Sequence, residues 1–224
     1  MPQATISSAC SVPLSVRKLL IGCALCLCTG MVLAGAYDDI IAAANNGEAS
    51  VVLRLIKRGM DVNTADSTGN TLLMLAVRDG HLPLMEALLV NRANLNRRNQ
   101  FGDTALMLGA LKARLETVRR LIDLGADLNP DGWTPLHYAI FGGSKEVTAF
   151  LIAKGAKLDA RAPNGQTPLM VAVKLGALDF VQQLIDADAD MDLTDYEGLS
   201  ALGLALKLGH EDIAGYLRSE GANE

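Results

Sequence analysis

The residues of this chain that could do chemistry are an alternating run of aspartates, three histidines and four cysteines. The aspartates stand at every second position, as Asp186, Asp188, Asp190 and Asp192. Carboxylates alternate in this way in a calcium-binding loop, which also needs a glycine near its centre for a sharp turn. No glycine interrupts this run. A calcium-binding or enzymatic role for the acidic segment 186–197 therefore stays an alternative function.

The histidines form no catalytic or metal-binding set. His81, His137 and His210 lie far apart, and no Gly-x-Ser-x-Gly elbow or phosphate-binding loop accompanies them. His81 and His210 each follow a glycine at the expected start of a helix, which favours a structural role at the helix start over a ligand role. We expect no enzyme activity, no metal and no cofactor.

The cysteines mark a separate N-terminal segment. The four of them are Cys10, Cys23, Cys26 and Cys28, and no acidic residue precedes Asp38. No cysteine is left in the rest of the chain, so the remaining fold must be held together by packing and without disulfides.

The segment 1–36 has the order of parts found in a signal peptide. A basic pair, Arg17 and Lys18, precedes the uncharged stretch 19–36, which ends in Ala34-Gly35-Ala36. Signal peptidase accepts only small side chains at its −3 and −1 positions, so we predict cleavage after Ala36. The alternative is an uncleaved membrane anchor, because this stretch is just long enough to cross about 30 Å of hydrocarbon.

Removing this segment changes the charge of the chain. The 224 residues have a formal net charge of −5, whereas residues 37–224 carry 18 basic and 25 acidic groups, a net charge of −7. Such an acidic domain is poorly suited to neutralising phosphates, so we expect no nucleic-acid partner. Residues 37–224 also lack an Asn-x-Ser/Thr sequon, which favours a bacterial periplasmic location. An uncleaved anchor would instead place the protein at the inner membrane.

Glycine spacing reveals internal repeats. One set of glycines recurs at Gly69, Gly102, Gly132, Gly165 and Gly198, with a constant interval except for a shorter step before Gly132. A constant interval of about 33 residues fits two short helices and a turn. The segments after these glycines are alike: Thr71-Leu-Leu-Met-Leu-Ala76, Thr104-Ala-Leu-Met-Leu-Gly109, Thr134-Pro-Leu-His-Tyr-Ala139, Thr167-Pro-Leu-Met-Val-Ala172 and Ser200-Ala-Leu-Gly-Leu-Ala205.

Each of these segments carries residues that begin and end a helix. A hydroxyl side chain opens every one and is placed to cap the free amides of the first turn. Pro135 and Pro168 then occupy a first helical position, where no hydrogen-bond donor is lost. A second set of positions should end the helices in the left-handed conformation: Gly80, Gly143, Gly176 and Gly209, with Ala113 completing the series. A second helix is expected to follow each of them.

With these motifs the chain resembles the ankyrin-repeat family. Thr134-Pro-Leu-His-Tyr-Ala139 carries the family hallmark, and Gly125-Ala-Asp-Leu-Asn129 and Gly155-Ala-Lys-Leu-Asp159 match its repeat ending. The resemblance implies an all-α fold over residues 37–224, an α-solenoid of about six repeats with helix-turn-helix units and short β-turn fingers. It also implies a structural hydrogen bond between repeats for His137. Repeats 1 to 6 fall at approximately 37–65, 66–98, 99–129, 130–161, 162–194 and 195–224, and the first helix should begin near Asp38.

Repeat 4 departs from this pattern. The step from Gly102 to Gly132 is three positions shorter than the others, so part of the projecting finger is missing at Pro130-Asp131-Gly132. A deletion tolerated in a surface turn is the simplest interpretation. The alternative is a notch in the row of fingers that shapes a partner site.

The resemblance implies that finger residues and the ends of the first helices line a concave groove. By that register the partner-binding candidates are Arg78, Asp79, Phe101, Asp103, Leu111, Lys112, Trp133, Phe141 and Lys174, with Lys207 one repeat further on. Exposed aromatic residues are typical interface anchors. We expect Phe101 and Trp133 to be exposed, whereas Tyr138 and Phe141 fit the core equally well.

Charge is also uneven along the repeats. The stretch 92–120 contains seven basic and two acidic side chains, and the stretch 186–197 contains six acidic and no basic ones. Solvated faces explain most such runs, and a polarised surface that steers a partner is the alternative.

These features predict a monomeric, exported, non-enzymatic scaffold that binds one protein partner. A sharper version is an inhibitor, immunity or protective partner of a periplasmic enzyme or toxin. A scaffold tethered to the inner membrane remains an alternative.

Overall fold

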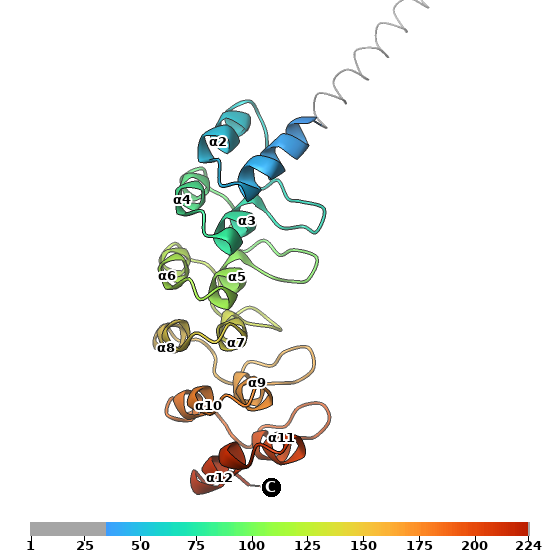
Figure 1. The fold of residues 1–224 in the computed structure, drawn as a ribbon, viewed down its shortest axis with the longest axis vertical. Coiled ribbons are helices and arrows are strands. Elements are labelled where there is room, and N and C mark those ends of the chain that lie inside the picture. Colours follow the sequence, from blue (N-terminus) through green and yellow to red (C-terminus); the bar gives the residue numbers. More distant parts are fainter. Residues whose placement is uncertain (1–34, 224) are drawn as a thin grey trace, which may run out of the picture.

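The computed structural model describes residues 35–223 and arranges them as pairs of helices stacked into one elongated column (Figure 1). The first helices of the pairs form an inner row: residues 35–45, α3 (Leu72–Asp79), α5 (Ala105–Leu111), α7 (Pro135–Phe141), α9 (Pro168–Lys174) and α11 (Ala201–Leu208). The second helices form an outer row: α2 (Ala49–Lys57), α4 (Leu82–Val90), α6 (Leu115–Asp123), α8 (Lys145–Ala153), α10 (Leu178–Ile185) and α12 (Glu211–Ser219). The predicted all-α solenoid is confirmed.

Loops project from the column beside the inner row (Figure 1). We call them fingers 2 to 6, after their repeats: residues 66–70, 99–103, 130–133, 162–166 and 195–199. In each finger except finger 4, the amide of the first residue donates to the carbonyl of the last, as Asp66 does to Asn70 at 2.9 Å and Asp195 to Leu199 at 3.0 Å. Isolated β-bridges pair Ala65 with Thr71 and Thr194 with Ser200. Finger 4 is the short loop beside α7.

The first helical segment begins earlier than expected. Residues 35–37 are already helical, so the helix does not begin near Asp38, and the predicted cleavage position after Ala36 lies inside it. The hydroxyl of Tyr37 donates to the carbonyl of Ala65 at 2.7 Å, which ties this helix to the end of repeat 1, just before finger 2. The predicted basic and apolar parts of the signal peptide lie outside the described residues. Within 35–223, no helix is long and apolar enough to cross a membrane.

The predicted capping residues begin the inner helices. The hydroxyls of Thr71, Thr104, Thr167 and Ser200 accept hydrogen bonds from the amide three positions on, at 3.1–3.3 Å. Each of these bonds satisfies one of the free amides of the first turn. The hydroxyl of Thr134 instead lies 2.9 Å from Nδ1 of His137, the ring nitrogen at the equivalent position.

Left-handed residues end the inner helices, as predicted. Gly80, Gly143, Gly176 and Gly209 have φ between 65° and 80°, and Ala113 adopts the same conformation with a φ of 54°. The structure adds two positions that we did not predict, Arg92 and Asp188, which have φ values of 62° and 69° at the ends of outer helices. A side chain in this conformation costs about 1–2 kcal/mol relative to glycine, so these three sites carry local strain.

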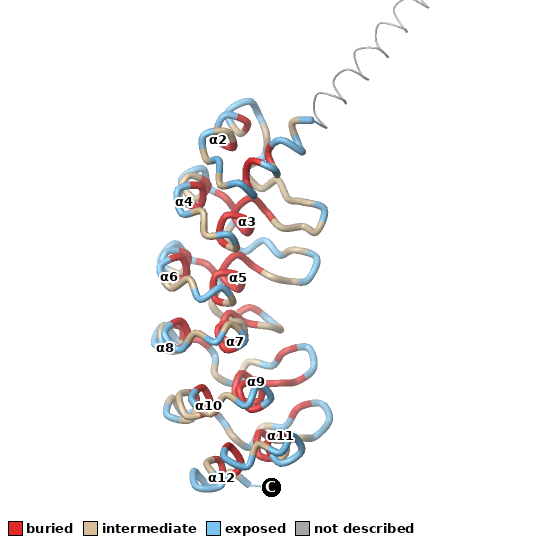
Figure 2. The backbone as a smooth tube through the Cα atoms, in the orientation of Figure 1, coloured by how far each residue is buried: buried red, intermediate tan, exposed pale blue. Residues whose placement is uncertain are grey.

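The core lies between the two rows of helices, and the finger tips are exposed (Figure 2). In α3, every residue from Leu72 to Val77 is buried, because neighbours on both sides cover this helix. The thin repeats pack through leucine, alanine and methionine. Gly109 lies at one such close contact, because a Cβ added there would lie 3.3 Å from Cγ1 of Val77. A repeat buries its apolar face only against its neighbours, so stability comes from the stack.

A ladder of side-chain acceptors ties each repeat ending to the next. The side-chain oxygens of Asn63, Asn96, Asn129, Asp159 and Asp192 accept from the amides of Asn94, Asp127, Lys157, Asp190 and Asn223, at 2.7–3.2 Å. The partners are 31 residues apart at four steps and 28 apart across repeat 4. The shortening of repeat 4 therefore leaves the stacking of the repeats unchanged.

Candidate functional site

The predicted partner-binding residues gather on what we call the finger-side surface. It comprises the C-terminal ends of the inner helices and the fingers that face them. Two contacts show that these parts meet: Nζ of Lys174 lies 3.4 Å from Oε1 of Gln166, and Nζ of Lys207 lies 3.3 Å from Oε2 of Glu197. Each contact joins the end of an inner helix to the finger of the same repeat.

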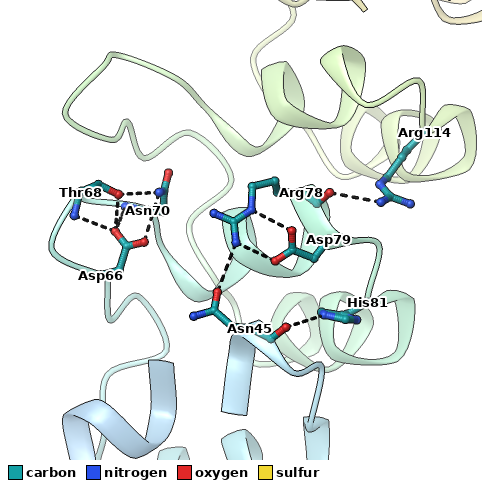
Figure 3. A network of polar contacts seen from close by, with 8 residues as sticks. All are labelled: Asn45, Asp66, Thr68, Asn70, Arg78, Asp79, His81 and Arg114. Carbon is teal, nitrogen blue, oxygen red and sulfur yellow. Dashed lines mark hydrogen bonds and ion pairs between the residues drawn. The ribbon is translucent and has the colours of Figure 1, made fainter. Parts of the chain in front are cut away.

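At the N-terminal end of this surface, Arg78 and Asp79 form a closed polar network (Figure 3). The guanidinium of Arg78 donates to both carboxylate oxygens of Asp79, at 2.8 and 2.7 Å, and to Oδ1 of Asn45 at 3.3 Å. The hydrogen bonds from Arg78 hold the pKa of Asp79 below its usual range. Both charges are thus neutralised within the chain.

The same network binds neighbouring repeats to one another (Figure 3). Nε2 of His81 lies 3.0 Å from the carbonyl oxygen of Asn45, and a guanidinium nitrogen of Arg114 donates to the carbonyl of Arg78 at 3.2 Å. His81 stands at the start of α4, as predicted, but its side chain makes no cap there and reaches back to repeat 1. Arg78 and Asp79 therefore contribute to stacking.

An acceptor at the start of the finger fixes its conformation, which the sequence reasoning missed. Oδ1 of Asp66 accepts from the amides of Thr68 and Asn70, each at 2.9 Å (Figure 3). Burial alone would raise the pKa of Asp66, but the hydrogen bonds from Thr68 and Asn70 lower it overall. Asn99 and Asp195 make the same pair of bonds in fingers 3 and 6. The signal was present in the sequence: each stands three positions before a finger glycine.

Asp103 supports the fold at the centre of the surface. Its carboxylate accepts hydrogen bonds from the hydroxyl of Tyr138 and, at 3.1 Å, from the side-chain amide of Asn99. Burial and the neighbouring carboxylate raise the pKa of Tyr138 above its usual range. Asp103 thus joins repeats 3 and 4, and its role as a partner contact stays a prediction.

Trp133 is half-buried, so the expectation that it is exposed was wrong. Its ring packs against the core, edge-on to His137 with centroids 5.2 Å apart and tilted against Phe141 at 5.5 Å. His137 and Phe141 are four positions apart on one face of α7, and Trp133, which precedes the helix, packs against both rings. Tyr138 is also half-buried, whereas Phe141 is exposed over 47% of its surface.

His137 lies fully buried beneath Trp133. Its Nδ1 accepts from the amide of Thr134 at 3.2 Å, and its Nε2 lies 3.3 Å from the carbonyl of Gln166 in repeat 5. This is the structural bond between repeats that the family resemblance implied. Burial lowers the pKa of His137 to about 4, so the ring is neutral and Nε2 carries the proton. In repeats 2, 3 and 5 a methionine sulfur at the equivalent position accepts the hydrogen bond from the threonine amide.

The remaining candidates stay accessible. Phe101, at the tip of finger 3, is 73% exposed, as predicted. Lys112 and Lys174 are exposed, and Leu111 is partly covered. Lys174 contacts Gln166 and no acid within residues 35–223, and no contact of the Lys112 ammonium group is found in the same range. The centre of the surface therefore combines exposed aromatic groups with two unpaired cations.

Finger 4 leaves a gap in the row of fingers. Full-length neighbours touch: a Cβ on Gly69 would meet the backbone nitrogen of Gln100 at 3.1 Å, and one on Gly165 would meet the ring of Tyr196 at 2.7 Å. A Cβ on Gly102, beside finger 4, would have Nη1 of Arg98 as its nearest neighbour, at 3.9 Å. The shortened finger 4 thus leaves a space beside Gly102, which we call the notch, and Arg98 crosses it, since its guanidinium donates to the carbonyl of Asp131 at 3.2 Å. A partner site at this notch stays a prediction.

The acidic segment 186–197 does not converge on one point. The carboxylate of Asp192 accepts from Asn223 at 3.2 and 3.3 Å, Oδ1 of Asp190 accepts from the amide of Asp192 at 2.9 Å, and Glu197 pairs with Lys207. Within the described residues, no group of three or more acidic, histidine or cysteine side chains is placed to hold a metal. The alternative of a calcium site has no geometric support in this part of the chain.

The basic run 92–120 is largely used inside the fold. Arg120 pairs with Glu86 at 3.0 Å, and Arg119 lies over the ring of Phe150 at 4.4 Å. Arg98 donates to the carbonyl of Asp131 at 3.2 Å, and Arg114 reaches the carbonyl of Arg78. These contacts join neighbouring repeats, which favours the solvated-face interpretation over a polarised surface for this run.

Comparison with known proteins agrees with the fold. A family model described as ankyrin repeats (3 copies) matches residues 15–99, 73–162 and 157–224. The crystal structure of the human ASB11 ankyrin repeat domain superposes with a TM-score of 0.71 and 27% identity, covering 82% of this chain and 84% of that one.

Curated relatives match over shorter stretches. The human Notch-regulated ankyrin repeat-containing protein is 38% identical over 86 residues, which are 35% of this chain and 75% of that protein. The ankyrin repeat domain-containing protein SAT10 of Stachybotrys chartarum is 29% identical over 125 residues, or 55% of this chain. The match spans only 6% of the length of SAT10.

Proposed function

The chain belongs to the ankyrin-repeat family, a family of protein-interaction scaffolds, and from this premise we propose that it binds a single protein partner through the centre of its finger-side surface. The observation that carries the proposal is the exposure of Phe101 and Phe141 beside the notch at finger 4. Exposed aromatic residues that a rigid scaffold holds in place lose little conformational freedom on binding.

We further propose that this chain is exported and meets its partner in the periplasm. The segment 1–36 supports export, with a basic pair, an apolar stretch and Ala34-Gly35-Ala36 at its end. In the periplasm the chain would act on one enzyme or toxin, as an inhibitor, immunity protein or protective partner, without catalysing a reaction itself.

Affinity purification of the full chain, tagged at its C-terminus in the cells that produce it, tests the binding site. The variant is Phe101→Ala, and Tyr196→Ala is a matched control, because both rings lie at finger tips and both are 73% exposed. We expect one protein to co-purify with the wild type and with Tyr196→Ala, and its recovery to fall at least tenfold with Phe101→Ala. Equal recovery with all three chains would overturn the proposed site.

Two further measurements test export and the role of the complex. Mass spectrometry of the purified chain should show an N-terminus at Tyr37; a chain that retains residues 19–36 would support the membrane-tethered alternative. If the partner is an enzyme, adding the purified chain should lower its activity or slow its inactivation. If the chain changed neither the activity of the partner nor its rate of inactivation, the inhibitory and protective roles would be excluded.

A further inference from the structure

The cations of the finger-side surface fall into two classes. Arg78 and Lys207, at the two ends, are paired with acids of their own repeats, Asp79 at 2.7 Å and Glu197 at 3.3 Å. Lys112 and Lys174, which stand at the ends of α5 and α9, have no acidic partner within residues 35–223. Two positive charges in the middle of the surface are thus left without counter-charges.

The uncompensated cations flank an apolar platform. Phe141 ends α7, the inner helix between α5 and α9, and Trp133 lies beneath it with ring centroids 5.5 Å apart. The end of α7 lies directly against the end of α5, since a Cβ on Gly142 would overlap the carbonyl oxygen of Leu111. Lys112 follows Leu111 and is exposed, so it stands next to the end of α7.

The notch lies beside finger 4, the loop that carries Trp133. Fingers 2 and 3 touch, and so do fingers 5 and 6, but the shortened finger 4 does not close the row beside Gly102. The repeat ladder passes this point undisturbed, with Asn129 accepting from Lys157 at 2.7 Å. The deletion therefore shortens the loop that leads into Trp133 and leaves the stacking of the repeats unchanged.

We propose that the partner presents an acidic segment that carries an aromatic or large aliphatic side chain, and that this segment binds at the notch. This inference rests on the proposed function and deepens it. The apolar side chain packs on Trp133 and Phe141, and carboxylates on both sides of it meet Lys112 and Lys174. Charge complementarity of this kind raises association rates and selects among partners.

The charge at the centre is opposite in sign to the net charge of the domain. Residues 37–224 have a net charge of −7, so the domain as a whole repels an acidic protein, and Lys112 and Lys174 offset this repulsion at the centre. A nucleic acid fits less well, because two lysines neutralise too few phosphates to offset this repulsion. A nucleic-acid partner is nonetheless a distinguishable outcome of the test.

Photo-crosslinking in the producing cells tests the chemistry of the partner. A benzophenone-bearing amino acid replaces Phe101 in the full chain, and the same probe at Val90, 78% exposed on the outer row, is the control. The crosslinked peptide from position 101 should have a net negative charge and at least one aromatic or large aliphatic residue. A basic peptide or a nucleotide adduct would overturn this inference and leave a partner site in place. No specific adduct at 101 would overturn the proposed function as well.

A defined probe tests the two lysines in the purified chain. The probe is a fluorescein-labelled peptide with four glutamates around one tryptophan, compared with a peptide that has lysines in place of the glutamates. We expect the acidic peptide to bind at least tenfold more tightly, and Lys112→Glu with Lys174→Glu to abolish that preference. Lys57→Glu with Lys157→Glu alters the net charge equally at exposed positions outside the finger-side surface and should retain it. If both double variants lost the preference for the acidic peptide to the same extent, a local role for Lys112 and Lys174 would be refuted.

Discussion

The N-terminal end and the centre of the finger-side surface are built from equivalent positions of the repeat, yet their side chains do different work. At the end of α3, Arg78 is held by Asp79 and Asn45 and serves the stack. One and two repeats further on, Leu111 and Phe141 occupy the same position, and Lys112 beside them has no acid within residues 35–223. A position in the repeat thus decides where a side chain points, and its neighbours decide whether it is free to bind.

The two regions also differ at the third residue of the inner helix. Met74 and Met107 accept the amide of the capping threonine through sulfur, at 3.4 and 3.3 Å. In repeat 4 the acceptor is a histidine ring that extends the chain of bonds to Gln166. The centre is therefore bonded to the next repeat at this position through a group that can take up a proton.

The largest expected effect is acid destabilisation through His137. Its folded pKa is about 4, and its unfolded pKa is about 6.5. As the pH falls from 6.5 to 4, the unfolded chain binds a proton at His137 that the folded chain does not. The contribution of His137 to stability is therefore complete above pH 6.5 and is lost as the pH falls below it. The free energy of unfolding should fall by about 3 kcal/mol through this group.

The variant His137→Met isolates this effect, because it installs the residue used in repeats 2, 3 and 5. Urea unfolding followed by circular dichroism between pH 7 and pH 4 should show the variant gaining about 3 kcal/mol relative to the wild type. Met107→Leu serves as the control: it removes a sulfur acceptor without a titrating group, and its difference from the wild type should not depend on pH. Parallel curves for the wild type and His137→Met would contradict the assignment.

A second prediction breaks the close contact between the inner helices at the centre. In Gly142→Ala the added methyl group overlaps the carbonyl oxygen of Leu111, and overpacking of this kind destabilises by about 2 kcal/mol. Gly215 in α12 has open space around its Cβ position, so Gly215→Ala should instead stabilise the chain by about 0.5–1 kcal/mol. Thermal unfolding measures both variants, and a stable Gly142→Ala chain would show that α5 and α7 are less closely packed than described.

A third prediction concerns the strained residue next to Lys112. Ala113 has a φ of 54°, and its counterpart one repeat later is Gly143, with a φ of 68°. Ala113→Gly should relieve this strain and raise the free energy of unfolding by about 1 kcal/mol, and Gly143→Ala should lower it by a similar amount. Opposite signs in chemical denaturation are the expected result. If both variants were destabilised, factors other than the left-handed backbone would control these positions.

Local patterns in the sequence predicted the repeat itself. The glycine periods locate the left-handed residues, and the threonine and proline positions locate the starts of the inner helices, because capping and turn formation depend on residues a few positions apart. The helical state of residues 35–37 escaped prediction. The strained Arg92 and Asp188 were also missed, although each stands 33 positions after a glycine that follows an outer helix, Gly59 or Gly155.

The binding surface was predicted less completely, because its properties depend on contacts between repeats. The bond from Tyr138 to Asp103 joins side chains 35 positions apart, and no motif within one repeat announces it. Likewise Trp133 is half-buried because its ring packs against His137 and Phe141 of α7, which the expected register did not take into account. The exposure of Phe101 was predicted correctly, since the tip of a finger has no neighbour to cover its ring.

The smallest expected effect comes from making the N-terminal end resemble the centre. Asp79→Asn removes the counter-charge of Arg78, and because the pair is partly exposed, the free energy of unfolding should fall by less than about 1 kcal/mol. The freed guanidinium should bind the acidic tryptophan peptide a few-fold more tightly than the wild type does, with the gain disappearing as salt is added. Glu116→Gln, at an exposed acid in α6 that lies 3.7 Å from Arg119, makes the same change in net charge and should give no such gain. If both variants tighten binding equally, net charge controls attraction; if only Asp79→Asn does, the pairing of individual cations decides which part of this surface can bind.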